Sequence, residues 1–152
     1  MLPPHVVFIE LDFDREDLGS RMIQSTFQTE QPTFFVWEGV TNYLTGTAVD
    51  STLRWIGSSA AGNELVFTYV HRDIIENYKC LATTERLRRT LARVGEPWRF
   101  GLHPAEVRDF LAARGLELVK DVNAREYRAR YLGETGAGYE FYHVVCARVV
   151  GI

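Results

Sequence analysis

Two carboxylate residues, Asp12 and Glu38, each follow an apolar run and are the first candidates for a binding function. Asp12 comes directly after "VVFIEL", and Glu38 comes directly after "FFVW". Such runs predict buried strands, and ligands of open α/β sheets bind beyond the carboxyl ends of the strands. A carboxylate there can accept hydrogen bonds from a ribose hydroxyl, an ammonium group or an exocyclic amine. The alternative is structural, because carboxylates at strand ends also cap helices or face water.

The segments that carry these residues alternate between strand patterns and helix patterns. Strands are expected at residues 5–13, 33–38, 63–70, 116–122 and 139–150, where β-branched and aromatic residues cluster. Helices are expected at residues 45–57, 103–115 and 123–132, and in a long pattern around Tyr78, Leu81, Leu87 and Leu91. This alternation predicts an α/β fold with a mostly parallel sheet and helices packed on it.

The helix expected at residues 45–57 has the clearest local signals. Val49, Leu53 and Ile56 recur at helical spacing, Thr47 and Asp50 stand in capping-box positions, and Gly57 is a stop signal. In contrast, "GETGAG" at residues 133–138 precedes the final strand and indicates a hairpin or connection, not a cofactor cradle.

Composition limits the class of protein. With 152 residues, 46% hydrophobic and 24% charged, the chain has ordinary globular composition, and we expect a single domain over residues 1–152. The net charge of -3 and the lack of a basic stripe argue against nucleic acid as a partner. No apolar run reaches the roughly 18 residues of a membrane span. Cys80 and Cys146 lack ligand spacing and are expected to be reduced thiols of a cytoplasmic protein.

Neither a metal site nor a nucleophilic catalytic motif is predicted. The four histidines, His5, His71, His103 and His143, do not show metal-ligand spacing. The stretch "HRDIIE" is interpreted as a cap between a loop and a helix, and no G-x-S-x-G elbow occurs.

The segment "FFVWEGVTNYLTGTAVDSTLRWI" resembles one motif of the leucine carboxyl methyltransferase (PPM1-like) family, in particular its actinobacterial branch. "ELDFDREDL" is similar to the acidic turn of that family, and "LVFTYV" and "GEPWRFGLHPAEVRDFLAARGLEL" are similar to later segments. The family consists of class I methyltransferases, transferases with a Rossmann-like fold that use S-adenosyl-L-methionine. The resemblance covers residues 5–150.

The resemblance implies roles for three residues in cofactor binding. Asp12 and Phe13, in "LDF", match the pair that contacts the adenine, and Glu38, in "WEG", matches the acidic residue near the α-ammonium of the methionine portion. Structural alternatives remain for both carboxylates: Asp12 as an Asx residue that caps a turn, and Glu38 as a carboxylate at a helix dipole.

Two further residues are weaker candidates for binding the methyl acceptor. Tyr43 follows on the same segment, with packing as the alternative role. Arg99, in "EPWRFG", offers a bidentate fork to an acidic substrate, with a solvated surface charge beside a core Trp98 as the alternative.

The chain departs from the family at its beginning, because the glycine-rich first strand that cradles the cofactor is not found. The resemblance therefore implies a partial Rossmann-like sheet that lacks the N-terminal half and has an antiparallel last strand. In the family's strand order, 3-2-1-4-5-7-6, two strands separate residues 5–10 from residues 33–38. We expect that these two strands pair directly, that a second copy of the chain covers the edge in a homodimer, or that the missing half comes from elsewhere.

Two functions of different class follow. The first is transfer of a methyl group from S-adenosylmethionine to a carboxylate or another oxygen of a small-molecule acceptor that the sequence does not indicate. Direct displacement requires no catalytic triad, and no catalytic residue is assigned. The second is a truncated, non-catalytic remnant that acts as an interaction or regulatory module.

Overall fold

The computed structural model describes residues 3, 5–76, 89–90, 93, 95–133 and 140–151. Its strands are β1 (Phe34–Trp37), β2 (Glu64–Val70), β3 (Leu116–Asn123) and β4 (Tyr142–Val149). Its helices are α1 (Leu18–Ile23), α2 (Gly46–Gly57), α3 (Asp73–Glu76), α5 (Val107–Ala112) and α6 (Ala124–Leu132), with 3-10 turns η1 (Thr41–Tyr43) and η2 (Pro104–Glu106). Within these ranges no helix is long and apolar enough to cross a bilayer.

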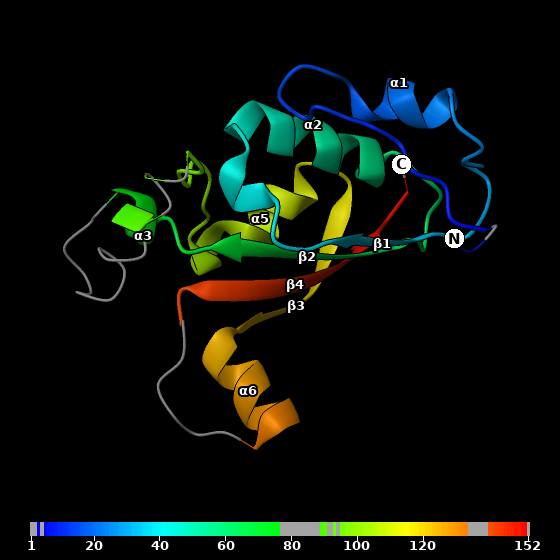
Figure 1. Cartoon of the computed structure of the whole chain (residues 1–152). Coiled ribbons are helices and arrows are strands. Elements are labelled where there is room, and N and C mark those ends of the chain that lie inside the picture. Colours follow the sequence, from blue (N-terminus) through cyan, green and yellow to red (C-terminus); the bar gives the residue numbers. More distant parts are fainter. Residues whose placement is uncertain are drawn as a thin grey trace.

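The four strands form one sheet in the order β1-β2-β4-β3 (Figure 1). β1 pairs with β2 in parallel, and β4 runs antiparallel to both β2 and β3. The predicted antiparallel last strand is confirmed, and the order equals the last four positions of the methyltransferase order. Four of the five predicted strands are present, although β4 begins at Tyr142 and not at Tyr139.

One face of the sheet carries α1, α2 and α5, and the core lies between these helices and the strands (Figure 1). The predicted apolar stripe of α2 is confirmed, because Val49, Leu53 and Ile56 are all buried. Phe67 of β2 and Leu111 of α5 are completely buried within the same cluster. The spacing of these residues therefore defines the buried side of each element.

The predicted capping box of α2 is wrong. Its N-cap is Thr45, whose hydroxyl accepts a hydrogen bond from the Ala48 N–H at 3.2 Å. Thr45 has an extended backbone ahead of the helix, whereas Thr47 already lies inside the first turn. Asp50 instead accepts a hydrogen bond from Arg54 Nε at 2.8 Å and serves as a surface ion-pair partner.

The strand predicted at residues 5–13 is wrong, and so is its direct pairing with β1. These residues form no strand, and Val7 and Phe8 are 58% and 74% exposed. In the described part of the chain, β1 pairs only with β2. The physical reason is that a strand needs a hydrogen-bonding neighbour, which this segment does not find here.

Other predictions fall on residues that the structure does not describe. The helical pattern around Tyr78, Leu81, Leu87 and Leu91, the thiol of Cys80 and the connection at residues 134–138 lie outside the described ranges.

Among the helices of the described residues, α6 is the one that lies over the opposite face of the sheet (Figure 1). On β1, Phe34 and Val36 point to this face and are 57% and 65% exposed, whereas Trp37 is 8% exposed. A cavity of about 490 Å³ lies here, and its lining includes Val66, Val144 and Tyr127 of α6. Sheets of α/β proteins are normally covered on both faces. Because Phe34 and Val36 are exposed here, this part of the sheet presents an apolar surface.

We predict that Gly57→Ala destabilises the fold, because a Cβ at residue 57 would lie 1.8 Å from the carbonyl oxygen of Arg114. Such overpacking costs about 1–3 kcal/mol of unfolding free energy or more. Urea denaturation measures this loss. Gly46→Ala is the matched control, since a Cβ at residue 46 would lie 4.0 Å from the Phe100 ring, which is ordinary van der Waals contact. An equal unfolding midpoint for both variants would contradict the prediction.

Candidate functional site

The carboxyl ends of β1 and β2 lie side by side, and Thr68 joins them. The Thr68 hydroxyl accepts a hydrogen bond from the Gly39 N–H at 2.8 Å, and Tyr142 donates to the same oxygen at 3.1 Å. The Thr68 carbonyl accepts from the Thr41 hydroxyl. These contacts fix the turn that follows β1. Sequence reasoning missed Thr68, because it stands inside an ordinary strand pattern.

Glu38 is exposed at this turn and forms no hydrogen bond or ion pair with any described residue. It lines one end of the cavity on the open sheet face, together with Val36, Thr68 and Tyr142. Burial, and to a smaller extent the Glu38 charge, raise the pKa of the Tyr142 phenol. The carboxylate at the beginning of α2 is that of Asp14, which accepts hydrogen bonds from Thr45, and not that of Glu38. The Glu38 carboxylate is available to a cationic or hydrogen-bond-donating ligand.

Phe13 lies at the same edge of the sheet. Its ring stacks on Trp37 with the ring centroids 5.9 Å apart and the planes at 30°. Successive side chains of a strand point to opposite faces, so Trp37 points to the helix side while Glu38 lines the open side. The structure therefore brings Phe13 and Glu38 to one edge but not into one cavity.

Asp12 caps a local turn. One carboxylate oxygen accepts from the Asp14 N–H at 3.1 Å, and the other lies 3.4 Å from Arg15 Nε. The Asp12 N–H itself donates to the Glu16 carboxylate at 2.9 Å. The Asx alternative thus describes Asp12 in this conformation, and its side chain is half-exposed.

Asp14 attaches this acidic turn to the rest of the molecule, a role that the sequence did not indicate. Its carboxylate accepts from the Thr45 hydroxyl at 2.8 Å, from the Thr45 N–H at 3.2 Å and from Arg99 Nη1 at 2.6 Å. The hydrogen bonds from Thr45, followed by that from Arg99, lower the pKa of Asp14. The turn is thereby held against the beginning of α2.

Tyr43 and Arg99, the two acceptor candidates, line the same cavity of about 520 Å³. The Arg99 N–H donates to the Asn42 carbonyl at 2.7 Å, which places residues 95–99 beside η1. The Arg99 guanidinium is paired with Asp14, so it does not present an unoccupied fork to a substrate here. Trp98 packs on Phe141 but is only half-buried and lies outside the core cluster, so the alternative of a core Trp98 is not confirmed.

Two buried polar atoms at this edge have no hydrogen-bond partner among the described residues. They are the donor Nε1 of Trp37 and the acceptor Oδ1 of Asn42. Buried polar atoms are normally satisfied, so these two mark a place where an added group can gain hydrogen bonds. Trp37 and the Phe13 ring lie on the helix side of this edge, whereas Glu38 lines the open side, so a ligand that contacts both must reach around the edge.

A polar group that sequence reasoning missed connects three strands below the site. Tyr69 donates to Asp121 at 2.7 Å, and Asp121 bonds His143 Nδ1 at 2.8 Å. The rings of Tyr69 and His143 also stack, with centroids 4.8 Å apart. Burial and the Asp121 charge raise the pKa of Tyr69, which keeps the phenol protonated. This network serves to fix β2, β3 and β4 relative to one another.

Comparison with known proteins gives a partial family match. Residues 1–57 match the model of the leucine carboxyl methyltransferase family. None of the curated proteins matches the chain significantly in sequence.

Solved structures share the fold over most of the chain. A DUF574 family protein from Streptomyces avermitilis MA-4680 has a TM-score of 0.66 at 17% identity, over 92% of this chain and 53% of that protein. A candidate methyltransferase from Thermobifida fusca YX has a TM-score of 0.54 at 18% identity, over 85% of this chain and 47% of that protein. The chain thus spans about half the length of these structures.

The four-stranded mixed sheet with flanking helices is therefore similar to methyltransferase folds. The match over residues 1–57 shows that this part of the chain is similar to the leucine carboxyl methyltransferase family, and the solved structures show the shared fold.

Proposed function

We propose that this chain forms part of an S-adenosylmethionine-dependent methyltransferase that acts on a carboxylate or another oxygen of a small acceptor. The observation that carries the proposal is the exposed, unpaired Glu38 carboxylate at the carboxyl end of β1. It stands at the sheet edge where open α/β folds bind ligands. The match of residues 1–57 supports the same assignment.

The proposed cofactor contacts come from three residues. Glu38 accepts hydrogen bonds from the α-ammonium, Asp12 accepts from the exocyclic amine of the adenine, and Phe13 contacts the ring. Glu38 can accept these hydrogen bonds without losing a contact to any described residue. Asp12 must first break its contacts with the Asp14 N–H and with Arg15. The glycine-rich cradle is not encoded in residues 1–152, so the proposal includes its supply by another polypeptide segment.

When bound, S-adenosylmethionine supplies an electrophilic methyl group for direct displacement by an acceptor oxygen. The protein then contributes orientation and exclusion of water, and a carboxylate acceptor needs no general base. The cavity lined by Tyr43 and Arg99 is the proposed place for the acceptor. Arg99 can pair with the carboxylate of an acceptor only if its ion pair with Asp14 breaks.

A second candidate function is that of an interaction module, and the exposed apolar side chains of β1 favour it. Phe34 and Val36 are exposed, and one edge of β1 has no strand partner among the described residues. Two β1 edges can pair in a two-fold symmetric dimer, which satisfies the backbone groups of both copies.

We also propose a cytoplasmic location, with which the free thiol of Cys146 is compatible.

We expect S-adenosylmethionine to bind the chain saturably and Glu38→Ala to weaken that binding by about 10- to 100-fold, the loss expected for one hydrogen bond to a charged group. Isothermal titration calorimetry measures both. Glu117→Ala removes an exposed carboxylate of β3 and serves as the control. Unchanged affinity in Glu38→Ala would refute the assignment of Glu38. Absence of binding heat would argue against cofactor binding by this chain and favour the interaction module.

We expect Asp14→Asn to have a lower melting temperature than the wild type at neutral pH. In acid, the difference in melting temperature between the variant and the wild type becomes smaller. The pKa of Asp14 is lowered in the folded state, so its stabilising effect is present above the ordinary carboxyl pKa of about 4. That effect is lost as the pH falls through the lowered value. Thermal unfolding between about pH 3 and 7 tests this, with Glu117→Gln as control. Identical curves for both variants at every pH would contradict it.

We expect the chain to dimerise through β1 if it acts as an interaction module. Val36→Lys then raises the dissociation constant at least about tenfold, because a charge enters the apolar contact. Sedimentation velocity over a concentration series measures this constant. Val150→Lys changes another exposed valine, 53% exposed against 65% for Val36, outside the strands and is the control. A monomer at all concentrations, or equal effects of the two variants, would rule out the β1 interface.

A further inference from the structure

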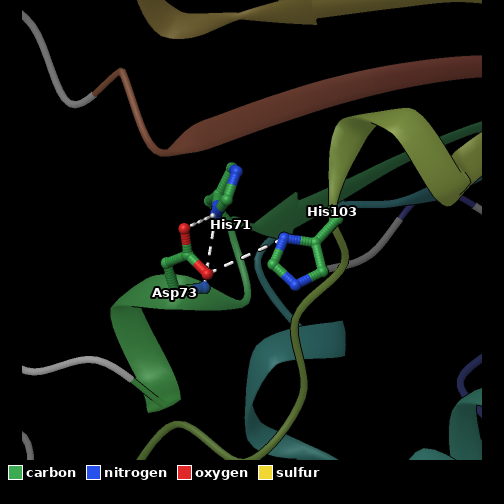
Figure 2. Close-up of side chains that lie close together, drawn as sticks. All are labelled: His71, Asp73 and His103. Carbon is green, nitrogen blue, oxygen red and sulfur yellow. Dashed lines mark hydrogen bonds and ion pairs between the residues drawn. The ribbon is translucent and has the colours of Figure 1, made fainter.

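His71, Asp73 and His103 come together beyond the carboxyl end of β2 (Figure 2). Asp73 lies between the two imidazoles, with Oδ2 3.7 Å from His71 Nδ1 and Oδ1 3.8 Å from His103 Nδ1. The rings of the two histidines meet edge to face, with centroids 5.1 Å apart. One ligand atom from each residue lies within 4.8 Å of the others. The sequence did not predict this cluster, because His103 comes from a separate segment.

The backbone fixes the two histidines beside each other. His71 and Leu102 form a parallel bridge, with Leu102 N–H bonded to the Val70 carbonyl at 3.1 Å and Arg72 N–H bonded to the Leu102 carbonyl at 3.0 Å. Gly101 allows this approach, since a Cβ there would lie 2.7 Å from the Val70 oxygen. His103 therefore follows directly on a residue whose backbone is hydrogen-bonded to the end of β2.

The charges around the cluster suit a cation. Arg72, the residue between His71 and Asp73, directs its guanidinium to Glu106 at 2.9 Å and to the Gly101 carbonyl at 3.3 Å. The positive charge of Arg72 is thus balanced by Glu106, and Asp73 leaves a net negative charge among the three residues. Imidazoles are mostly neutral above about pH 7 and then offer a lone pair to a metal.

We propose that His71, Asp73 and His103 bind one divalent first-row transition metal ion such as Zn²⁺. Two imidazole nitrogens and one carboxylate oxygen form a three-ligand set that leaves a coordination position open, as in catalytic and not structural zinc sites. The nitrogen ligands favour zinc or iron over calcium and magnesium, which prefer oxygen ligands. The side chains are 28%, 41% and 31% exposed, so an ion can enter from solvent.

Binding requires a small rearrangement. Each ligand atom must come to about 2.0–2.2 Å from the ion, so the three side chains close around it. His71 Nδ1 at present accepts the Asp73 N–H at 3.2 Å, and the ion replaces this hydrogen bond if Nδ1 is the ligand. The site is additional to the proposed methyl transfer, which needs no metal, and its test does not involve S-adenosylmethionine.

The test uses the tag-free chain, stripped of metal with a chelator and titrated with Zn²⁺ and with Co²⁺. We expect one ion per chain, a higher melting temperature with Zn²⁺, and cobalt absorption bands without a thiolate charge-transfer band. Asp73→Asn and His103→Ala each weaken binding at least about tenfold. His5→Ala, which removes an exposed histidine outside the cluster, leaves it unchanged.

Three results would overturn the proposal: no stoichiometric binding, equal binding by Asp73→Asn and the wild type, or loss of binding in Cys146→Ser instead. Circular dichroism of each metal-free variant shows that the fold is kept. Asp73→Asn is nearly isosteric, so it supplies a usable comparison even if His103→Ala unfolds.

Discussion

The close packing of residues 100–103 against the end of β2 is the contact on which both candidate regions depend. Leu102 extends the sheet by bonding to the Val70 carbonyl, and Gly101 makes the approach sterically feasible. On one side of this contact, Arg99 bonds to η1 and closes the cavity shared with Tyr43. On the other side, His103 is set beside His71, the residue that directly follows β2. The backbone contact between residues 100–103 and the end of β2 thus positions the residues of both candidate regions at the carboxyl edge of the sheet.

Elements with strong local patterns could be predicted from the sequence. The α2 stripe of Val49, Leu53 and Ile56 is buried as expected, because helical spacing determines which side chains share a face. The segment at residues 5–13 also contains a run of apolar residues, but it forms no strand. Strand formation depends on a neighbouring strand, and the periodicity of one segment carries no information about its neighbour.

The candidate site could be predicted only where a residue stands next to a recognisable element. Glu38 was found because it follows β1 directly, and Phe13 because of the motif around it. Asp14 could not be found, since its partner Arg99 is 85 positions away. The same limit applies to the Tyr69, Asp121 and His143 network, whose members face one another only after the sheet has formed. Long-range side-chain pairs require the tertiary structure.

Dissolved salt weakens the ion pair between Asp14 and Arg99, because both side chains are partly exposed. This pair attaches the acidic turn to the segment around Arg99, whereas two hydrogen bonds from Thr45 attach the same turn to the beginning of α2. The core of β2, β4 and α5 does not depend on either contact. Raising the ionic strength therefore weakens one attachment of the turn that carries Phe13, while the hydrogen bonds from Thr45 and the sheet remain. We therefore expect a ligand that contacts Phe13 to bind slightly less tightly in salt, even when the ligand itself carries no net charge.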